Sequence, residues 1–241
     1  MGAEGLLKHL VDGLGGCFSS SLGIDLSGAA PEEVFKWFLA AVLFGARISD
    51  KIAANTYREF EQNDVLTPEA IQNTGWEGLV KTLDAGGYVR YDFKTATKLL
   101  DIARSLIEDY QGDLNQLHAR AKGPEDLAER LQALAKGIGP VTVNIFLREL
   151  RDVWKKADPP PQELVILAAG NLGLTQSSRP RDVLDELRSL WNRDGSADRT
   201  FADFENSLLR LGKDFCRKAK CNICSMAPFC KTSKTRIDAQ V

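Results

Sequence analysis

Residues 134–143 have the sequence LAKGIGPVTV and join two segments whose apolar residues recur at helical spacing. Gly137 and Gly139 flank one apolar residue, Ile138, so the chain can turn tightly there and expose backbone N–H groups. The helix expected after Pro140 adds the positive end of its dipole. Such a turn can hold a DNA phosphate without reading the base sequence, while Ile138 fills the interior of the hairpin. An ordinary connection between two helices is the alternative.

The rest of the chain also has the pattern of helices, and strand signals are scarce. Helix starts are expected at Ser27, Thr67 and Asp158, where a capping residue precedes an acid or a proline. Breaks are expected at residues 86–87, 123–124, 137–140 and 159–161, which contain glycine, proline or both. The sequence therefore predicts an all-α fold of roughly ten helices.

The composition is that of an ordinary globular protein, with 241 residues, 44% of them apolar and 27% charged. The apolar runs are shorter than the roughly 18 residues that a membrane span needs, so we expect no membrane partner. The N-terminal residues lack the pattern of a signal peptide. We therefore expect a cytoplasmic protein, associated with the nucleoid in a bacterium, and a monomer.

The net charge of −2 is unusual for a nucleic-acid-binding protein, but the charge is unevenly distributed. Residues 212–236 contain one acid, Asp214, and seven basic residues: Lys213, Arg217, Lys218, Lys220, Lys231, Lys234 and Arg236. A chain of nearly neutral charge can still present a basic face.

Four of the five cysteines lie in the run Cys216-x4-Cys221-x2-Cys224-x5-Cys230. Four thiolates so close together can bind zinc or a [4Fe–4S] cluster. Zinc sites usually separate two cysteine pairs by a longer loop, whereas this run is compact, which favours the [4Fe–4S] cluster. Zinc remains the alternative, followed by no metal. The basic residues between the cysteines suit contacts with phosphate.

The hairpin and the cysteine run together resemble the endonuclease III branch of the helix-hairpin-helix DNA glycosylases. Two upstream segments are similar to family patterns as well. Residues 43–50, LFGARISD, resemble an early helix ending in L-L-S-A-Q-x-T-D, and Gly86-Gly87-Tyr88 followed by Lys94 and Lys98 resembles G-[LY]-Y…K-A. The resemblance covers roughly residues 35–232.

This resemblance implies two all-helical domains, with bent double-stranded DNA between them and the target nucleotide flipped out of the stack. Residues 37–150 would form a central helical barrel that ends in the helix-hairpin-helix. Residues 1–36 and 151–241 would form the iron–sulfur domain, in which Cys216, Cys221, Cys224 and Cys230 hold a structural [4Fe–4S] cluster.

The resemblance also implies a catalytic aspartate about 20 residues after the hairpin, which stabilises positive charge on the sugar as the base leaves. Asp158 lies 19 residues after Gly139 and is the candidate. Asp152 is six residues earlier and is expected inside the preceding helix, so it fits less well. A simple helix cap before Pro159 is the alternative role of Asp158.

The sequence departs from the family pattern at four places. Val141 stands where bifunctional members carry the lysine that forms a Schiff base, which predicts an enzyme that leaves the abasic strand intact. Arg47 stands in place of the glutamine that fills the gap left by the flipped base. The first two cysteines are four residues apart, where the family usually has six. Residues 159–161 are all proline, so the local sequence beside Asp158 also differs from the family pattern.

The predicted function is therefore a monofunctional DNA glycosylase of base-excision repair. A relative that has lost catalysis and binds distorted DNA is the alternative, and a bifunctional enzyme with its lysine elsewhere is a further one. The expected DNA contacts are Arg47, Tyr88, Gly137, Ile138, Gly139, Val141, Thr142, Lys218 and Lys220.

Overall fold

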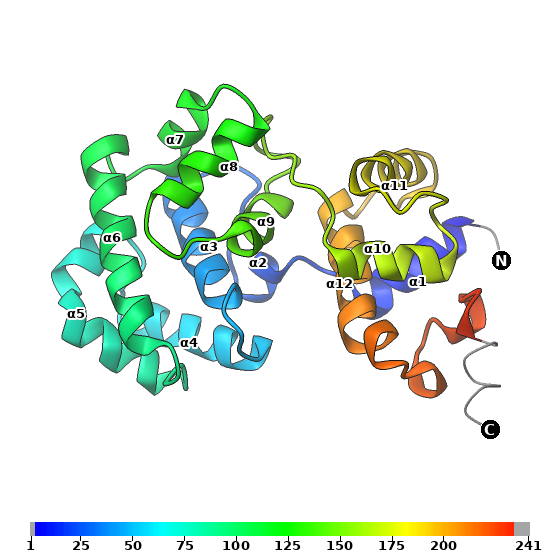
Figure 1. The fold of residues 1–241 in the computed structure, drawn as a ribbon, viewed down its shortest axis with the longest axis horizontal. Helices are drawn as coiled ribbons and strands as arrows, with labels where there is room; N and C mark the ends of the chain where they lie inside the picture. The colour runs from blue at the N-terminus through cyan, green and yellow to red at the C-terminus, as the bar shows by residue number, and fades with distance from the viewer. Residues whose placement is uncertain (1–2, 234–241) are drawn as a thin grey trace. The chain divides into compact units, whose positions relative to one another are not determined.

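The computed structural model describes residues 3–233, and these residues contain helices but no strand. The prediction of an all-α fold is confirmed (Figure 1). The helices are α1 (Ala3–Leu14), α2 (Phe18–Ser21), α3 (Pro31–Phe44), α4 (Asp50–Gln62), α5 (Pro68–Ala85), α6 (Asp92–Tyr110), α7 (Leu114–Arg120), α8 (Pro124–Ala133), α9 (Pro140–Arg148), α10 (Glu163–Leu172), α11 (Pro180–Asp194) and α12 (Phe201–Asp214). Three short 3-10 turns follow: η1 (Cys216–Lys218), η2 (Cys221–Ile223) and η3 (Ala227–Phe229). Lys234 and Arg236 of the basic segment lie outside the described residues.

The chain divides into two units, the central unit of residues 19–159 and the end unit of residues 1–18 and 160–241. Both chain ends contribute to one unit, but the boundaries differ from the predicted residues 37 and 150. Helix α3 crosses the first predicted boundary, and Trp37 in it is fully buried and donates a hydrogen bond to the Phe146 carbonyl (3.0 Å). The second boundary shifts because the Trp154 indole N–H donates to Asn115 Oδ1 (2.9 Å) and Lys156 Nζ donates to the His118 carbonyl (2.7 Å), which ties residues 151–159 to the central unit.

The central unit is built around α3, which packs against α4, α7 and α9, while α5 packs along α6. Phe38 of α3 and Phe146 of α9 are in edge-to-face contact in the core, with ring centroids 4.9 Å apart. Thr67 caps α5, where its side chain accepts a hydrogen bond from the Ala70 N–H, so this predicted helix start is confirmed. The start predicted at Ser27 is wrong: the chain turns at Ala29 (φ 48°) before α3 begins at Pro31.

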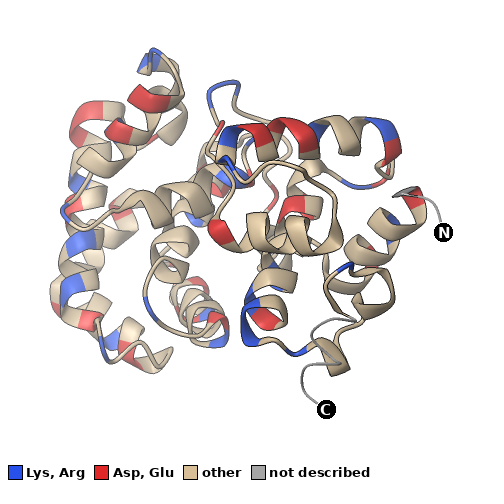
Figure 2. Cartoon of the chain, turned by 45° about the vertical axis from the view of Figure 1, so that its right-hand side comes forward, with Lys and Arg blue, Asp and Glu red and all other residues tan. Residues whose placement is uncertain are grey.

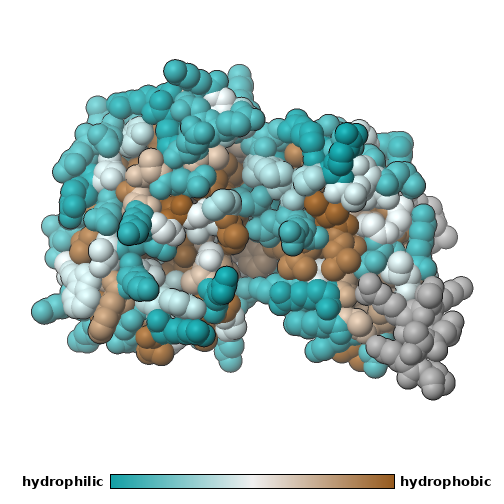
Figure 3. Space-filling view, in the orientation of Figure 1, coloured by the Kyte–Doolittle hydropathy of each residue, from teal (hydrophilic) through white to brown (hydrophobic). Residues whose placement is uncertain are grey.

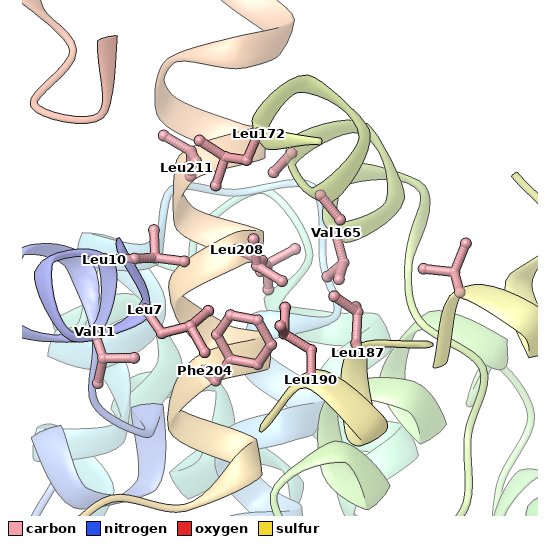
Figure 4. Packing of buried hydrophobic residues seen from close by; sticks show 14 of the residues in the cluster. Leu7, Leu10, Val11, Val165, Leu172, Leu187, Leu190, Phe204, Leu208 and Leu211 are labelled. Atoms are coloured by element: carbon pink, nitrogen blue, oxygen red, sulfur yellow. The ribbon is translucent and has the colours of Figure 1, made fainter. Parts of the chain in front are cut away.

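The end unit is formed by α1, α10, α11 and α12 around a leucine-rich core (Figure 4). Phe204, Leu208 and Leu211 of α12 face this core, together with Leu7 and Leu10 of α1. Helices α10 and α12 touch closely at Gly212, where a Cβ atom would lie only 2.1 Å from the Leu164 carbonyl oxygen. This packing fixes the C-terminal end of α12, from which the cysteine run continues.

Charged residues of both signs are interspersed along the helices of both units (Figure 2). In the face seen in Figure 3, polar residues predominate and apolar residues form separate patches. Among the described residues, no helix combines the length and the apolar character required to cross a bilayer.

Candidate nucleic-acid interface and metal centre

The turn between α8 and α9 has the geometry that its two glycines predict. Gly137 has a φ of +93°, in the left-handed region that favours glycine, and Gly139 is extended at φ −104° and precedes α9. Ile138 is 5% exposed and its N–H donates to the Ala135 carbonyl (3.3 Å). Ile138 therefore supports the turn from inside, as expected for the hairpin interior, and offers neither its side chain nor its N–H to a ligand.

The N-terminal turn of α9 is the part of the hairpin whose backbone N–H groups could bind an anion. Gly139 has no side chain with which to cap the helix, so no side chain accepts from the first N–H groups, those of Val141 and Thr142. The Val141 side chain is 56% exposed and the Thr142 side chain is buried. Val141 thus brings one backbone donor at the positive end of the helix dipole to the surface, which is a physical requirement for holding an anion.

The segment that contains Arg47 lies beside this helix start. A Cβ atom on Gly45 would lie 2.2 Å from the Thr142 hydroxyl oxygen, so the C-terminal end of α3 and the first turn of α9 are in close contact. Arg47 follows on the exposed turn after Gly45, and Ser49 then caps α4 by accepting from the Ile52 N–H (3.2 Å). The structure therefore brings together two segments, far apart in the sequence, that the sequence proposes as DNA contacts.

Lys98 of α6 is a neighbour of the hairpin to which sequence analysis gave no role. Its Cε and Nζ atoms lie 3.2 and 3.6 Å from the position that a Cβ on Gly137 would occupy. Partial burial lowers the pKa of Lys98 from its ordinary value. The only signal in the sequence was the Lys94-x-x-x-Lys98 spacing, which does not indicate contact with a turn 39 residues away.

Tyr88 does not fit its predicted role as a DNA contact. It is only 2% exposed, its hydroxyl lies 3.5 Å from that of Thr95, and burial raises its pKa. The neighbouring Val89 is 64% exposed, and the Arg90 guanidinium lies over the Tyr91 ring at 5.4 Å. The surface of the α5–α6 connection is therefore formed by the residues after Tyr88, because Tyr88 anchors the connection in the core.

Asp158 lies in an irregular segment and does not begin a helix. Helix α10 starts at Glu163 after Gln162, so the predicted start at Asp158 and its role as a helix cap are wrong. Each proline of residues 159–161 disfavours helical geometry in the residue before it, which delays the helix. Asp152 is exposed in the turn that follows α9, because that helix ends at Arg148 and not beyond Asp152 as expected.

The Asp158 carboxyl is paired with a buried arginine. Its Oδ1 lies 3.4 Å from Arg151 Nη1, and the two side chains are 18% and 1% exposed respectively. The carboxyl therefore remains in reach of solvent on one side while a fixed positive charge lies on the other. Asp158 belongs to the same unit as the hairpin.

All four cysteines of the C-terminal run line one small cavity in the end unit, with a volume of about 20 Å³. Leu172, Leu211 and Met226 supply apolar wall, and Asn171 also lines the cavity. Three 3-10 turns carry the thiols around this space. Burial raises the pKa of Cys224, and the nearby Cys230 and Cys221 raise it further.

The cysteine loop is attached to the end of α10. The Lys231 N–H donates to the Asn171 carbonyl (3.0 Å), and Cys230 Sγ lies 3.4 Å from the same oxygen. The Ser233 hydroxyl donates to the Ala227 carbonyl (2.7 Å). The structure describes no group of three or more His, Cys, Asp or Glu side chains that would hold a single metal ion within residues 3–233. All four cysteines nevertheless line the same cavity, and cysteine thiolates are the usual ligands of iron–sulfur clusters.

The basic residues between the cysteines are exposed. Lys218 Nζ lies 3.6 Å from Asp214 in an exposed ion pair, and Arg217 Nε donates to the Lys213 carbonyl (3.0 Å). Lys220 is exposed after Ala219, which has a positive φ of 50°. This loop presents cations to solvent, although the Asp214 carboxylate offsets part of the Lys218 charge.

No protein-family model matches the chain. No curated protein matches it either.

Proposed function

We propose that the chain is a DNA glycosylase that flips a damaged or mismatched base out of double-stranded DNA and removes it by hydrolysis. The observation that carries the proposal is the hairpin between α8 and α9. It combines a glycine-dependent turn, an uncapped helix N-terminus and the adjoining Arg47 segment on one unit. These features suit a DNA backbone that is held without reading its sequence.

Each proposed site residue has a separate role. The Val141 and Thr142 N–H groups hold a phosphate, and the Arg47 guanidinium occupies the gap left by the flipped nucleotide. The Asp158 carboxylate stabilises positive charge on the sugar while the bond between C1′ and the base breaks. A water oxygen then bonds to C1′, one proton leaves that water, and the base departs with a proton. The product is an abasic strand without a nick, since Val141 carries no amine that could form an imine.

The four cysteines at the end-unit cavity would hold a [4Fe–4S] cluster. When bound, the cluster supplies rigidity to the loop and no chemistry at the base, because four thiolates fill the protein-facing coordination positions. The loop then presents Lys218 and Lys220 at fixed positions for contact with phosphate.

The experiment that tests the proposal is an excision assay on a panel of duplexes, each with one damaged or mismatched base. Products are analysed with and without alkali. Excision that becomes visible as strand cleavage only after alkali supports a monofunctional glycosylase. Cleavage without alkali, with a covalent adduct trapped by borohydride, indicates a bifunctional enzyme and directs the search to Lys98 or Lys136.

A protein that binds distorted DNA without excising a base is the second candidate. It is favoured by the absence of an amine at position 141 and by the net charge of −2. Tight binding to mismatched or abasic duplexes, combined with no excision over the whole panel, would identify this second function.

A further inference from the structure

Arg151 is a buried charged residue of the central unit that the mechanism above does not use. Its side chain is 1% exposed. Nη1 lies 3.4 Å from Asp158 Oδ1, and Nη2 donates to the Pro159 carbonyl at 2.6 Å. One guanidinium thus contacts both the carboxyl of Asp158 and the backbone of the residue that follows it.

The chain between Arg151 and Asp158 is also held in place. Trp154 is buried, its indole N–H donates to Asn115 Oδ1 (2.9 Å), and its ring stacks on His118 with centroids 4.6 Å apart. Lys156 Nζ donates to the His118 carbonyl (2.7 Å). These contacts attach the segment to α7, so the position of Asp158 is constrained from the residues before it and, through Arg151, from the residue after it.

A buried guanidinium is a costly way to stabilise a fold. Its desolvation offsets most of what the ion pair contributes, and an apolar side chain of similar volume often gives equal or greater stability. Arginine does offer a planar fork that can orient a carboxylate and a carbonyl together, and a permanent positive charge that favours the ionised carboxyl. Both properties affect the charge and the orientation of the Asp158 carboxyl group more than they affect the stability of the central unit.

We infer that Arg151 is a positioning residue, which fixes the direction of the Asp158 carboxylate. The pair leaves the carboxyl 18% exposed, so a substrate can still reach it. This inference rests on the proposed function, in which the Asp158 carboxylate faces the sugar.

The first test follows the Asp158 carboxyl directly and needs no substrate. Its ¹³C signal is assigned by its loss in Asp158→Asn and titrated by NMR in the wild type, Arg151→Met and Arg151→Lys. Removing the positive charge makes the carboxyl harder to deprotonate, so its titration midpoint moves to higher pH in Arg151→Met. Arg151→Lys keeps the charge and gives an intermediate midpoint. A midpoint that does not move in Arg151→Met would overturn the inference.

The second test measures excision in single-turnover reactions on the best duplex of the panel. Losing the fixed direction of a catalytic group lowers the rate in Arg151→Met by about 10- to 100-fold. In an Asp158→Asn background, Arg151→Met should not lower the excision rate further, because both residues act through the Asp158 carboxylate. Multiplied losses in the double variant would overturn the inference, since Arg151 would then act independently of Asp158.

Control variants and melting temperatures separate positioning from folding and from the failure of the proposed function. Arg130→Met removes an arginine that pairs with Asp126 at 3.0 Å within α8, and should excise normally. Partial rescue by Arg151→Lys, at an unchanged melting temperature, supports positioning, whereas rates that follow the melting temperature in every variant contradict it. If the wild type excises no base at all, the proposed function fails together with the catalytic role of Asp158. An unchanged NMR midpoint in an active enzyme rejects the role of Arg151 alone.

Discussion

Asp158 combines partial exposure with a close positive neighbour, which suits its proposed role as a negative group near the sugar of a flipped nucleotide. Its Oδ1 faces Arg151, and its main-chain N–H donates to the Lys156 carbonyl (3.0 Å). The side chain therefore has a defined direction before any substrate arrives. Pre-organisation of this kind is what makes an electrostatic contribution effective in a transition state.

Replacing Asp158 by asparagine keeps the shape of the side chain and removes its negative charge. We expect the excision rate to fall on the order of 10² to 10³, equivalent to about 3 to 4 kcal/mol. DNA affinity should fall little or rise, because a carboxylate repels phosphate. Single-turnover kinetics and DNA titrations measure the two effects, and melting temperature reports folding.

Asp152→Asn is the matched control for this substitution. Asp152 lies on the exposed turn six residues earlier, so its variant should excise at the wild-type rate. Wild-type excision by a well-folded Asp158→Asn protein would remove Asp158 from the mechanism.

Single residues also show where sequence reasoning reaches its limit. The family resemblance, which implies an aspartate about 20 residues after the hairpin, selects Asp158 as a candidate. Nothing in the sequence indicates that Arg151 pairs with it, since that contact depends on how residues 151–159 fold back. Tyr88 was assigned to the surface because of its position in a motif, yet its burial depends on the packing of α5 and α6. Contacts that depend on tertiary packing are therefore the part of the site that local patterns cannot provide.

At the scale of elements, local chemistry predicted the helix boundaries well wherever one capping group acts alone. Thr67 before Pro68 and the glycine turn at residues 137–140 are examples. The same reasoning failed at Asp158, where three successive prolines shift the helix start to Glu163, and at Ser27, where Ala29 has a positive φ. A cap signal is thus reliable only if the residues that follow it can adopt helical geometry at once.

The two glycines of the hairpin differ in whether their backbone conformation requires glycine. Gly137 needs a φ of +93°, and an alanine there is strained by about 1 to 3 kcal/mol. Gly137→Ala should therefore lower the melting temperature and weaken DNA binding. Gly139→Ala should lower the melting temperature much less, because its φ of −104° suits any residue and its Cβ would meet nothing within 4 Å. Equal losses of stability in the two variants would contradict the role assigned to the turn.

The cysteine loop predicts what the purified protein contains. Material prepared anaerobically should be brown, with four irons and four acid-labile sulfides per chain. Cys224→Ser should lose most of the iron and visible absorbance and lower the melting temperature, because Cys224 lines the cavity of the end unit. Cys17→Ser should keep the full iron content, since Cys17 lies outside the four-cysteine run. One zinc per chain with no iron would reject the cluster and support the zinc alternative.

At the scale of the whole molecule, the two units carry different kinds of candidate phosphate contact. The central unit offers backbone donors at the start of α9, and the end unit offers lysine side chains on the cysteine loop. With a net charge of −2 the chain as a whole does not attract DNA, so the proposed DNA binding would have to depend on these local features. Backbone donors carry no net charge, so most of the salt dependence of binding should come from the basic side chains.

Neutralising Lys218 and Lys220 together by substitution with glutamine should therefore weaken binding and flatten its salt dependence. The slope of the logarithm of affinity against the logarithm of salt concentration should decrease by up to about two units, nearly one for each phosphate contact that is lost. The loss should be smaller if Asp214 already neutralises Lys218, which lies 3.6 Å from it. Fluorescence anisotropy with one duplex at several salt concentrations measures the slope.

Lys8→Gln with Arg181→Gln is the charge-matched control, because both residues lie on helices of the same unit outside the loop and should leave the slope near that of the wild type. An identical slope in the wild type and the Lys218/Lys220 variant would show that these lysines do not touch phosphate, and the hairpin would then remain as the proposed contact.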